Sequence, residues 1–253
     1  SDVYKRQVLE GEKYAINIWF REANVKIPYT YTPIDTVSDI KKRDEVYSIE
    51  LNSSNNNILH EPISQDPYIT HLKSIFTHEE CDFLIRNCTN GKEQGQRRIS
   101  HWINLKSQTM KPIVEKIANF FQILTEYYEN MNIIEYNVGS LHGCHFDAFD
   151  LTSQRGITEN SSRGQRVYTM IGMLSSSEYD GFIKFTNLPD KAIICNKGNA
   201  IVYKNVLDYD EKIGNQRDER LSYNISQIKN EKIYLFYLYI IDKNYNGEKL
   251  DLE

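Results

Sequence analysis

The sequence has little glycine, little proline and no long apolar run. Its 253 residues include 12 glycines and 6 prolines, and no apolar run approaches the roughly 18 residues of a membrane-spanning helix. The longest candidate, Ile233 to Ile241, is rich in residues that favour strands and predicts a buried strand. The net charge of −5 leaves no excess of basic residues, which disfavours nucleic acid as a partner.

Cysteine occurs four times, but nowhere in the C-x-x-C spacing of redox or zinc sites. Isolated cysteines are most often buried free thiols, and we expect that state here. The positions are Cys81, Cys88, Cys144 and Cys195.

Histidine is missing from the whole chain beyond residue 145. The last one belongs to the stretch LHGCHFDAFD, where His145 and Asp147 form a His-x-Asp pair. On an extended segment these residues face one side, and an imidazole with a carboxylate suits Fe(II), Mn(II) or Zn(II). A metal site needs a further ligand, and such a pair alone is more often a hydrogen-bonded pair at the surface. His142 would face the opposite side of a regular strand, so we expect it in a loop or partly exposed.

The N-terminal segment is unusual. Residues 1–7, SDVYKRQ, resemble neither a signal peptide nor an ordinary start, and they match one reading frame of a common sequencing adapter. We therefore expect residues 1–7 to be an artefact. Residues 8–22, VLEGEKYAINIWFRE, resemble residues 227–241, QIKNEKIYLFYLYII, because both place a Glu-Lys pair before an aromatic-rich strand. We expect residues 8–22 to be the closing strand of a preceding domain; the alternative is two unrelated strands that share a dipeptide.

One complete domain is expected after a linker. Residues 23–66 are polar and contain proline, which predicts a linker with one short strand at Val46 to Leu51. The domain itself is expected from 67 to 243, with a tail from 244 to 253.

The domain begins with helices and continues with strands. Thr77 and Glu80 can form a capping box, which predicts a helix from His78 to about Asn87. A longer helix is expected from about Gln108 to Tyr128, since its apolar residues recur every three or four positions. After Asn132 the pattern changes to short strand-like runs separated by turn residues. This order predicts an antiparallel sandwich or barrel with helices packed outside.

The complete domain also carries an ordered series of short motifs. In chain order they are Tyr136-x-x-Gly139, His145-x-Asp147, Arg166-x-x-Thr169, Asp180-Gly181 with Phe185, Lys197-Gly198-x-Ala200 and Glu231-Lys232. This order resembles the C-terminal catalytic domain of the prolyl 4-hydroxylase family of Fe(II)/2-oxoglutarate dioxygenases, over about Pro67 to Asp242. The resemblance implies an α+β fold with a double-stranded β-helix (jelly-roll) core and flanking N-terminal helices.

The resemblance implies roles for particular residues. His145 and Asp147 would bind Fe(II), and Lys232 would pair with the distal carboxylate of 2-oxoglutarate; the alternative for Lys232 is a solvated lysine at a strand end. Tyr136 and Thr169 would hydrogen-bond the same cosubstrate. Ascorbate is implied as a further cofactor, and a peptidyl proline or similar protein residue as the substrate. The family also implies the endoplasmic reticulum or secretory pathway, with the preceding dioxygenase domain as a partner.

The chain departs from this family at the distal iron ligand. Ten residues before Lys232, where the family has a histidine, this sequence has Ser222. With only His145 and Asp147 as ligands, iron affinity should fall and the cosubstrate geometry should loosen. Three nearby oxygen donors could approach the vacancy, although their chemistry differs from that of imidazole: Asp218, Glu219 and Tyr223.

Two functional hypotheses follow, with a third behind them. The first is a prolyl hydroxylase-type Fe(II)/2-oxoglutarate dioxygenase weakened by loss of the distal histidine. The second is a catalytically inactive copy that binds a peptide or supports an active neighbouring domain. Gly172 stands where many members of the family have a tyrosine that contacts the cosubstrate, and Asp180 departs from the family's Gly-Gly motif. The third, a cupin-like metal protein or a plain binding jelly roll, predicts that Lys232 does not point toward His145.

Overall fold

The larger of two antiparallel sheets has eight strands, in the order β1-β2-β10-β7-β12-β5-β4-β3. In the computed structural model the described residues are 58–121, 123–177, 180–188, 192–193, 195–207 and 215–242, all within one compact unit. The expected adapter segment, the strand remnant at 8–22, most of the linker and the tail lie outside these residues. The strands of this sheet are β1 (Leu59–Ser64), β2 (Ile69–Lys73), β3 (Lys92–Glu93), β4 (Arg98–Ile103), β5 (Met131–Tyr136), β7 (Arg166–Met173), β10 (Ala200–Lys204) and β12 (Ile233–Ile241).

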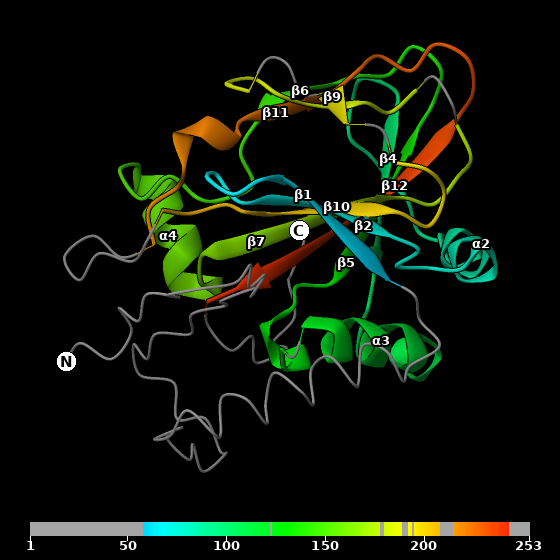
Figure 1. Ribbon diagram of the computed structural model, residues 1–253, viewed down its shortest axis with the longest axis horizontal. Coiled ribbons are helices and arrows are strands. Elements are labelled where there is room, and N and C mark those ends of the chain that lie inside the picture. Colours follow the sequence, from blue (N-terminus) through cyan, green and yellow to red (C-terminus); the bar gives the residue numbers. More distant parts are fainter. Residues whose placement is uncertain are drawn as a thin grey trace, which may run out of the picture. The chain divides into compact units, whose positions relative to one another are not determined.

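The smaller sheet has four strands, in the order β6-β11-β8-β9, and faces the larger sheet (Figure 1). All pairings between the named strands are antiparallel. Two facing antiparallel sheets form the double-stranded β-helix, or jelly-roll, core that the sequence predicted. The strands of the smaller sheet are β6 (His142–His145), β8 (Ile183–Phe185), β9 (Ala192–Ile193) and β11 (Tyr223–Ile225).

Helices lie outside the two sheets. Helix α3 runs along the face of the larger sheet that is turned away from the smaller one (Figure 1). Its apolar stripe is buried, as the sequence predicted. Within the described residues, no helix is long and apolar enough to cross a membrane. The helices are α2 (His78–Arg86), α3 (Lys111–Phe121) and α4 (Gln154–Arg163), with 3₁₀ segments η1 (Gln108–Met110), η2 (Thr125–Tyr127) and η3 (Glu219–Leu221).

The sequence predicted the start of α2 correctly but not the end of α3. The capping box of α2 is confirmed, because the Glu80 N–H donates to the Thr77 hydroxyl at 3.2 Å and the Thr77 N–H donates to the Glu80 carboxylate at 2.7 Å. The second helix, α3, begins at Lys111 after the 3₁₀ segment that starts at Gln108, and it ends at Phe121 rather than Tyr128. Leu124, which continues the apolar period, is 39% exposed. The chain turns there toward β5, and that turn overrides the helical pattern.

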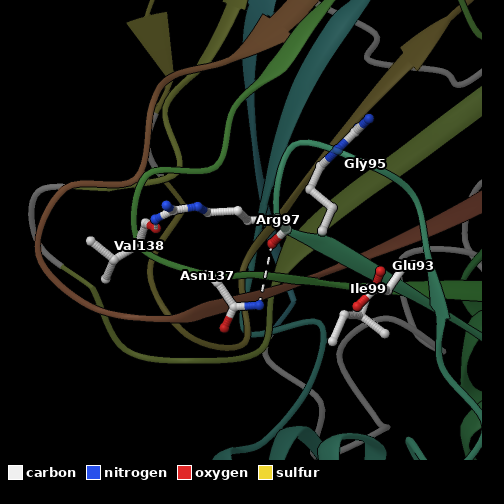
Figure 2. A pocket seen from close by; sticks show the side chains of 7 residues that line it. Glu93, Gly95, Arg97, Ile99, Asn137 and Val138 are labelled. Atoms are coloured by element: carbon white, nitrogen blue, oxygen red, sulfur yellow. Dashed lines mark hydrogen bonds between the residues drawn. The ribbon is translucent and has the colours of Figure 1, made fainter.

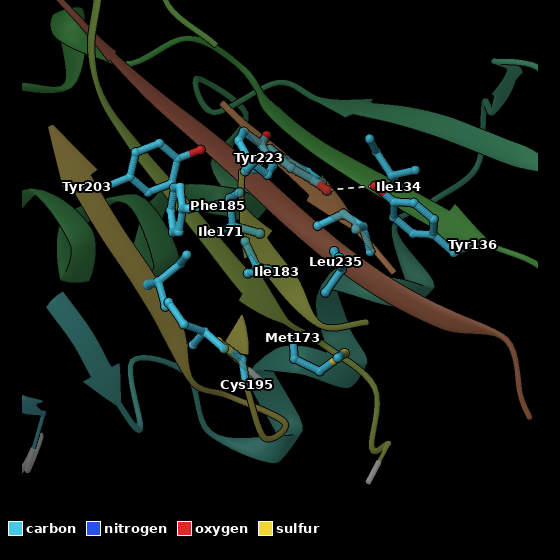
Figure 3. Close-up of a cluster of buried hydrophobic side chains, with 14 of the residues drawn as sticks. Ile134, Tyr136, Ile171, Met173, Ile183, Phe185, Cys195, Tyr203, Tyr223 and Leu235 are labelled. Atoms are coloured by element: carbon cyan, nitrogen blue, oxygen red, sulfur yellow. Dashed lines mark hydrogen bonds between the residues drawn. The ribbon is translucent and has the colours of Figure 1, made fainter. Parts of the chain in front are cut away.

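The core between the sheets combines aliphatic side chains with buried tyrosines (Figure 3). Tyr136, Tyr203 and Tyr223 are each 0% exposed. A buried phenol needs a hydrogen-bond partner, so these rings bring hydroxyl groups into an otherwise apolar space. Other members are Ile134, Ile171, Met173, Ile183, Phe185, Cys195 and Leu235.

Four strands precede α3, although within the domain the sequence predicted strands only after Asn132. One of them, β1, falls in the segment expected to be a linker and pairs with β2. The sheet therefore begins upstream of Pro67, where the sequence placed the start of the domain. These early strands are short and mix polar with apolar residues, which leaves only a weak period-two signal.

Candidate metal site and its surroundings

A bulge in β6 places two histidines on one face of the smaller sheet. Tyr223 of β11 lies opposite His145 and Ile225 lies opposite His142, so three steps along β6 match two along β11. Such an extra residue breaks the alternation of side chains. The two imidazole rings are stacked, with centroids 4.1 Å apart and planes inclined by 13°. The prediction that His142 faces away from His145 is therefore wrong.

The structure brings His145 and Asp147 together at the end of β6. The strand ends at His145, and Asp147 lies in the loop that follows rather than on the same strand. The His145 Nδ1–H donates to the Gly143 carbonyl at 2.9 Å, which leaves the lone pair on Nε2. This Nε2 is 3.7 Å from Asp147 Oδ1. An imidazole nitrogen and a carboxylate oxygen thus face a common point.

Hydroxyl groups surround the Asp147 carboxylate, which is only 4% exposed. Thr169, Tyr203 and Tyr223 donate to its Oδ2 atom at 2.9, 2.7 and 3.1 Å. Burial raises the pKa of Tyr203 and of Tyr223, and the negative charge of Asp147 raises both further. Both phenols are therefore protonated donors. Thr169, expected at the cosubstrate, holds the carboxylate here.

The hydroxyl group beside His145 belongs to Tyr223 and not to Ser222. Tyr223 Oη is 2.9 Å from His145 Nε2. Ser222 instead accepts a hydrogen bond from Thr186 at 3.4 Å, and the Thr186 hydroxyl also contacts the exposed Cys144. Neighbouring residues of an extended segment point to opposite faces, so Ser222 faces away from the site. Of the residues considered for the missing ligand, Tyr223 therefore lies beside His145 and Ser222 does not. Cys144 is exposed and is not the buried thiol we expected.

Lys232 points away from the site. Its Nζ lies 3.3 Å from Glu135 Oε1 and 5.3 Å from the centre of the Tyr234 ring, and its side chain is 47% exposed. The next residue, Ile233, faces the core opposite Tyr136 and is 0% exposed. A shift of one residue moves every side chain of a strand to the other face. The role expected for Lys232 at the cosubstrate carboxylate does not fit this position.

Arg98 is a cation that lies beside Tyr136, directly opposite it across β4 and β5. Arg98 Nε is buried without a hydrogen-bond partner among the described residues. Tyr136 Oη is 2.6 Å from Tyr237 Oη and 2.9 Å from His142 Nδ1. Burial raises the pKa of Tyr136, while Tyr237 and the Arg98 guanidinium act in the opposite direction. Burial lowers the pKa of His142 to about 2, helped by the neighbouring His145 and by the Arg98 guanidinium, so His142 is neutral.

A pocket of about 440 Å³ opens beside Arg98 (Figure 2). The Asn137 amide donates to the Arg97 carbonyl at 3.2 Å, and the Arg97 guanidinium donates to the Val138 carbonyl at 3.2 Å. These bonds join the turn before β4 to the turn after β5. The pocket is lined by Glu93, Gly95, Arg97, Arg98, Ile99, Asn137 and Val138.

Comparison with known proteins shows which proteins this chain is similar to. No protein-family model matches the chain. The chain is 28% identical over 158 residues to prolyl 4-hydroxylase 13 of Arabidopsis thaliana, which is 56% of each of the two chains. It shares its fold with the viral collagen prolyl hydroxylase of Paramecium bursaria Chlorella virus-1, solved as a 2-oxoglutarate complex. The TM-score is 0.53 at 16% identity, over 71% of this chain and 98% of that one. A truncated form of the viral protein gives a TM-score of 0.51, over 72% and 94% of the two chains.

The chain thus resembles prolyl 4-hydroxylase 13 in sequence and the viral prolyl hydroxylase in fold. Lys232 has the orientation that the third hypothesis, a cupin-like or plain binding jelly roll, predicted.

The prolyl 4-hydroxylase-like domain fits an iron centre in part. A non-haem iron site of the facial-triad type uses two histidines and one carboxylate. Among the described residues, no three His, Cys, Asp or Glu side chains gather as a metal-binding group. His145 and Asp147 supply one donor of each kind, and the hydroxyl that contacts both belongs to Tyr223. Two of the three expected donors thus lie close together, and the Tyr223 phenol contacts both of them.

Proposed function

We propose that this prolyl 4-hydroxylase-like domain is an Fe(II)/2-oxoglutarate dioxygenase of the peptidyl-prolyl hydroxylase type with strongly reduced turnover. The observation that carries the proposal is the pair formed by His145 Nε2 and Asp147 Oδ1, 3.7 Å apart, with the imidazole already in the tautomer that a metal requires. The similar Arabidopsis and viral proteins are named as prolyl hydroxylases. A peptidyl proline or a similar protein residue is therefore the substrate class we assign.

His145 and Asp147 would hold the iron, which supplies the oxidising chemistry when it is bound. Thr169 orients the Asp147 carboxylate through its 2.9 Å hydrogen bond. We expect reduced turnover because of the donor set. The usual site has a second imidazole, and here a phenol occupies that place, which changes the ligand field of the iron.

The 2-oxoglutarate cosubstrate would extend from His145 toward Arg98. His142 stacks on His145, Tyr136 bonds to His142, and Arg98 lies beside Tyr136. A carboxylate placed here would gain a charge-assisted bond to the guanidinium and a bond to the phenol. We assign the distal carboxylate to Arg98 and Tyr136, in place of Lys232.

Release of succinate tests this function. Purified protein is incubated with Fe(II), 2-oxoglutarate, ascorbate and a proline-rich peptide, and succinate is measured over time. We expect slow release that depends on the peptide and disappears in Asp147→Asn, which keeps the size of the side chain. Equal succinate in both proteins, or none in either, would overturn the assignment as an active domain.

The second candidate is a non-catalytic copy that binds a peptide beside an active domain. It is favoured by the Tyr223 hydroxyl, which bonds to both expected iron ligands. The same assay separates the two functions. A non-catalytic copy would release no succinate, and Asp147→Asn would bind the peptide as tightly as the unchanged protein does. The preceding dioxygenase domain, inferred from residues 8–22, stays a prediction.

A further inference from the structure

Three donor atoms of the described site are spaced as ligands of one metal ion. Tyr223 Oη is 2.9 Å from His145 Nε2 and 3.2 Å from Asp147 Oδ1, and the latter two atoms are 3.7 Å apart. Metal bonds to nitrogen and oxygen are about 2.0–2.2 Å long, so donors at right angles lie about 3 Å apart and wider angles lengthen this. The three atoms therefore form the triangle that a single ion spans, with only small movements needed.

Other hydroxyl groups near Asp147 do not share this geometry. Tyr203 and Thr169 both donate to Oδ2 of Asp147, whereas Oδ1 is the oxygen 3.7 Å from His145 Nε2. Tyr223 alone among the described residues contacts the carboxylate and the imidazole together. A threonine hydroxyl is also a weak ligand, whereas a phenol becomes an anionic oxygen donor once it loses its proton.

The Tyr223 ring is held firmly in place. It is 0% exposed and packs against the rings of Phe185 and Tyr203, with centroids 6.0 and 5.8 Å away (Figure 3). Its strand, β11, pairs with β6 on one side and β8 on the other. A side chain fixed in this way presents its oxygen without a further loss of conformational entropy.

We propose that Tyr223 is the third protein ligand of a metal site formed with His145 and Asp147, and that this site prefers ferric over ferrous iron. The inference rests on the proposed function for metal binding at His145 and Asp147. When the iron–oxygen bond forms, the phenol O–H bond breaks and one proton passes to the solvent. The bound phenolate and carboxylate carry two negative charges, which favours a trivalent ion. A preference for ferric iron also explains why turnover that needs Fe(II) would be slow.

The visible spectrum of the iron-loaded protein tests the ligand. A phenolate bound to ferric iron gives a charge-transfer absorption band in the visible region. We load the unchanged protein, Tyr223→Phe and Tyr203→Phe with ferric citrate or, without oxygen, with a ferrous salt, and remove unbound iron. We then record bound iron, the visible spectrum and far-UV circular dichroism, and binding of ferrous iron by the unchanged protein to the same extent as ferric iron would overturn the preference. We expect the band in the unchanged protein and in Tyr203→Phe, and its loss in folded Tyr223→Phe.

The outcomes separate this inference from the proposed function. Bound ferric iron without a visible band, or a band that survives in Tyr223→Phe, would overturn the role of Tyr223 alone. If the band is lost in Tyr203→Phe and kept in Tyr223→Phe, the phenolate ligand is Tyr203 and the proposal is wrong. If the unchanged protein binds neither ferric nor ferrous iron, the metal site itself fails, and with it the proposed function.

Discussion

Tyr223 and Ser222 adjoin in sequence, yet only Tyr223 reaches His145, because its hydroxyl lies 2.9 Å from the Nε2 atom while Ser222 bonds to Thr186. A histidine at 223 would place an imidazole beside His145 and Asp147. We expect Tyr223→His to raise the rate of succinate release by about tenfold or more, since even changes in the groups that support metal ligands alter activity by about 10–100-fold. Ser222→His is the matched control, and its rate should stay within about twofold of the unchanged protein. A higher rate of succinate release in Ser222→His, with no increase in Tyr223→His, would show that residue 222 and not residue 223 faces His145.

Arg98 and Lys232 offer a second test at single residues. Arg98 lies beside Tyr136 inside the domain, while Lys232 pairs with Glu135 and is half exposed. A bond to a charged group contributes about 1.5–3 kcal/mol, so Arg98→Met should weaken 2-oxoglutarate binding by about 10–100-fold. Lys232→Met, with the same loss of charge, should leave the affinity within about twofold. Calorimetric titration with 2-oxoglutarate in the presence of Mn(II) measures both, and the opposite ranking would return the cosubstrate carboxylate to Lys232.

At the scale of elements, Asp180 fixes the turn that leads into β12. Its carboxylate is 0% exposed and accepts the backbone N–H groups of Lys229, Asn230 and Glu231, at 2.9, 2.9 and 3.4 Å. Burial alone would raise the pKa of Asp180, but these three N–H groups lower it below the usual value. The departure from the family motif at Asp180 thus has a structural reason.

The low pKa of Asp180 makes its contribution to stability depend on pH. Because the folded pKa lies below the unfolded value near 3.9, the contribution is complete at neutral pH and is lost as pH falls below about 4. We expect Asp180→Asn to lower the free energy of unfolding by about 1.5–3 kcal/mol at pH 7. Urea denaturation at pH 7 and pH 3 measures the difference, which should shrink at pH 3. Glu115→Gln, at an exposed position, is the control. An equal loss of free energy of unfolding in the two variants would contradict the role of Asp180 in this turn.

The elements also show which parts of the site were predictable from sequence. The capping box at Thr77 and Glu80 located α2 because that motif is local. The orientation of β12 was not predictable, since IYLFYLYII is apolar throughout and has no alternation to mark its inner face. The bulge in β6 likewise has no sequence signal, so His142 was misplaced. Arg98 was missed because its closeness to Tyr136 exists only in the register of β4 and β5.

Gly172 is a further departure that packing explains. A Cβ atom there would lie 2.2 Å from the ring of Phe236 and 2.7 Å from the Asn199 carbonyl oxygen. A tyrosine at this position, as in many members of the family, does not fit the present packing. The packing of Phe236 and of the Asn199 backbone against β7 therefore requires a residue without a side chain at Gly172.

At the scale of the whole molecule, metal binding should stabilise the folded domain. A ligand at about 100 times its Kd adds about 2.7 kcal/mol to the free energy of unfolding, which corresponds to a rise in Tm of about 5–10 °C for a domain of this size. We expect this rise when Mn(II) is added to the unchanged protein, and a much smaller one for Asp147→Asn. Thermal denaturation followed by circular dichroism measures both. An equal rise in the two proteins would place the metal elsewhere.

The fold of the whole domain was predictable because the order of its motifs carries more information than any one of them. The two facing sheets and the outer helices follow that order, and His145 and Asp147 meet as the His-x-Asp motif suggested. Spacing along the chain placed the missing ligand at Ser222, whereas the pairing of β11 with β6 brings Tyr223 opposite His145. Counting residues along the chain can locate a position with an error of one residue. A shift of one residue moves a side chain to the other face of its strand.

The central claim is that a metal ion lies between His145 and Asp147 with Tyr223 at ligand distance. An anomalous difference map from crystals of the ferric-loaded protein, recorded at the iron absorption edge, tests it most directly. We expect one strong peak at bonding distance from His145 Nε2, an Asp147 oxygen and Tyr223 Oη. A map with no peak between these atoms, and with Tyr223 still hydrogen-bonded to His145, would contradict it.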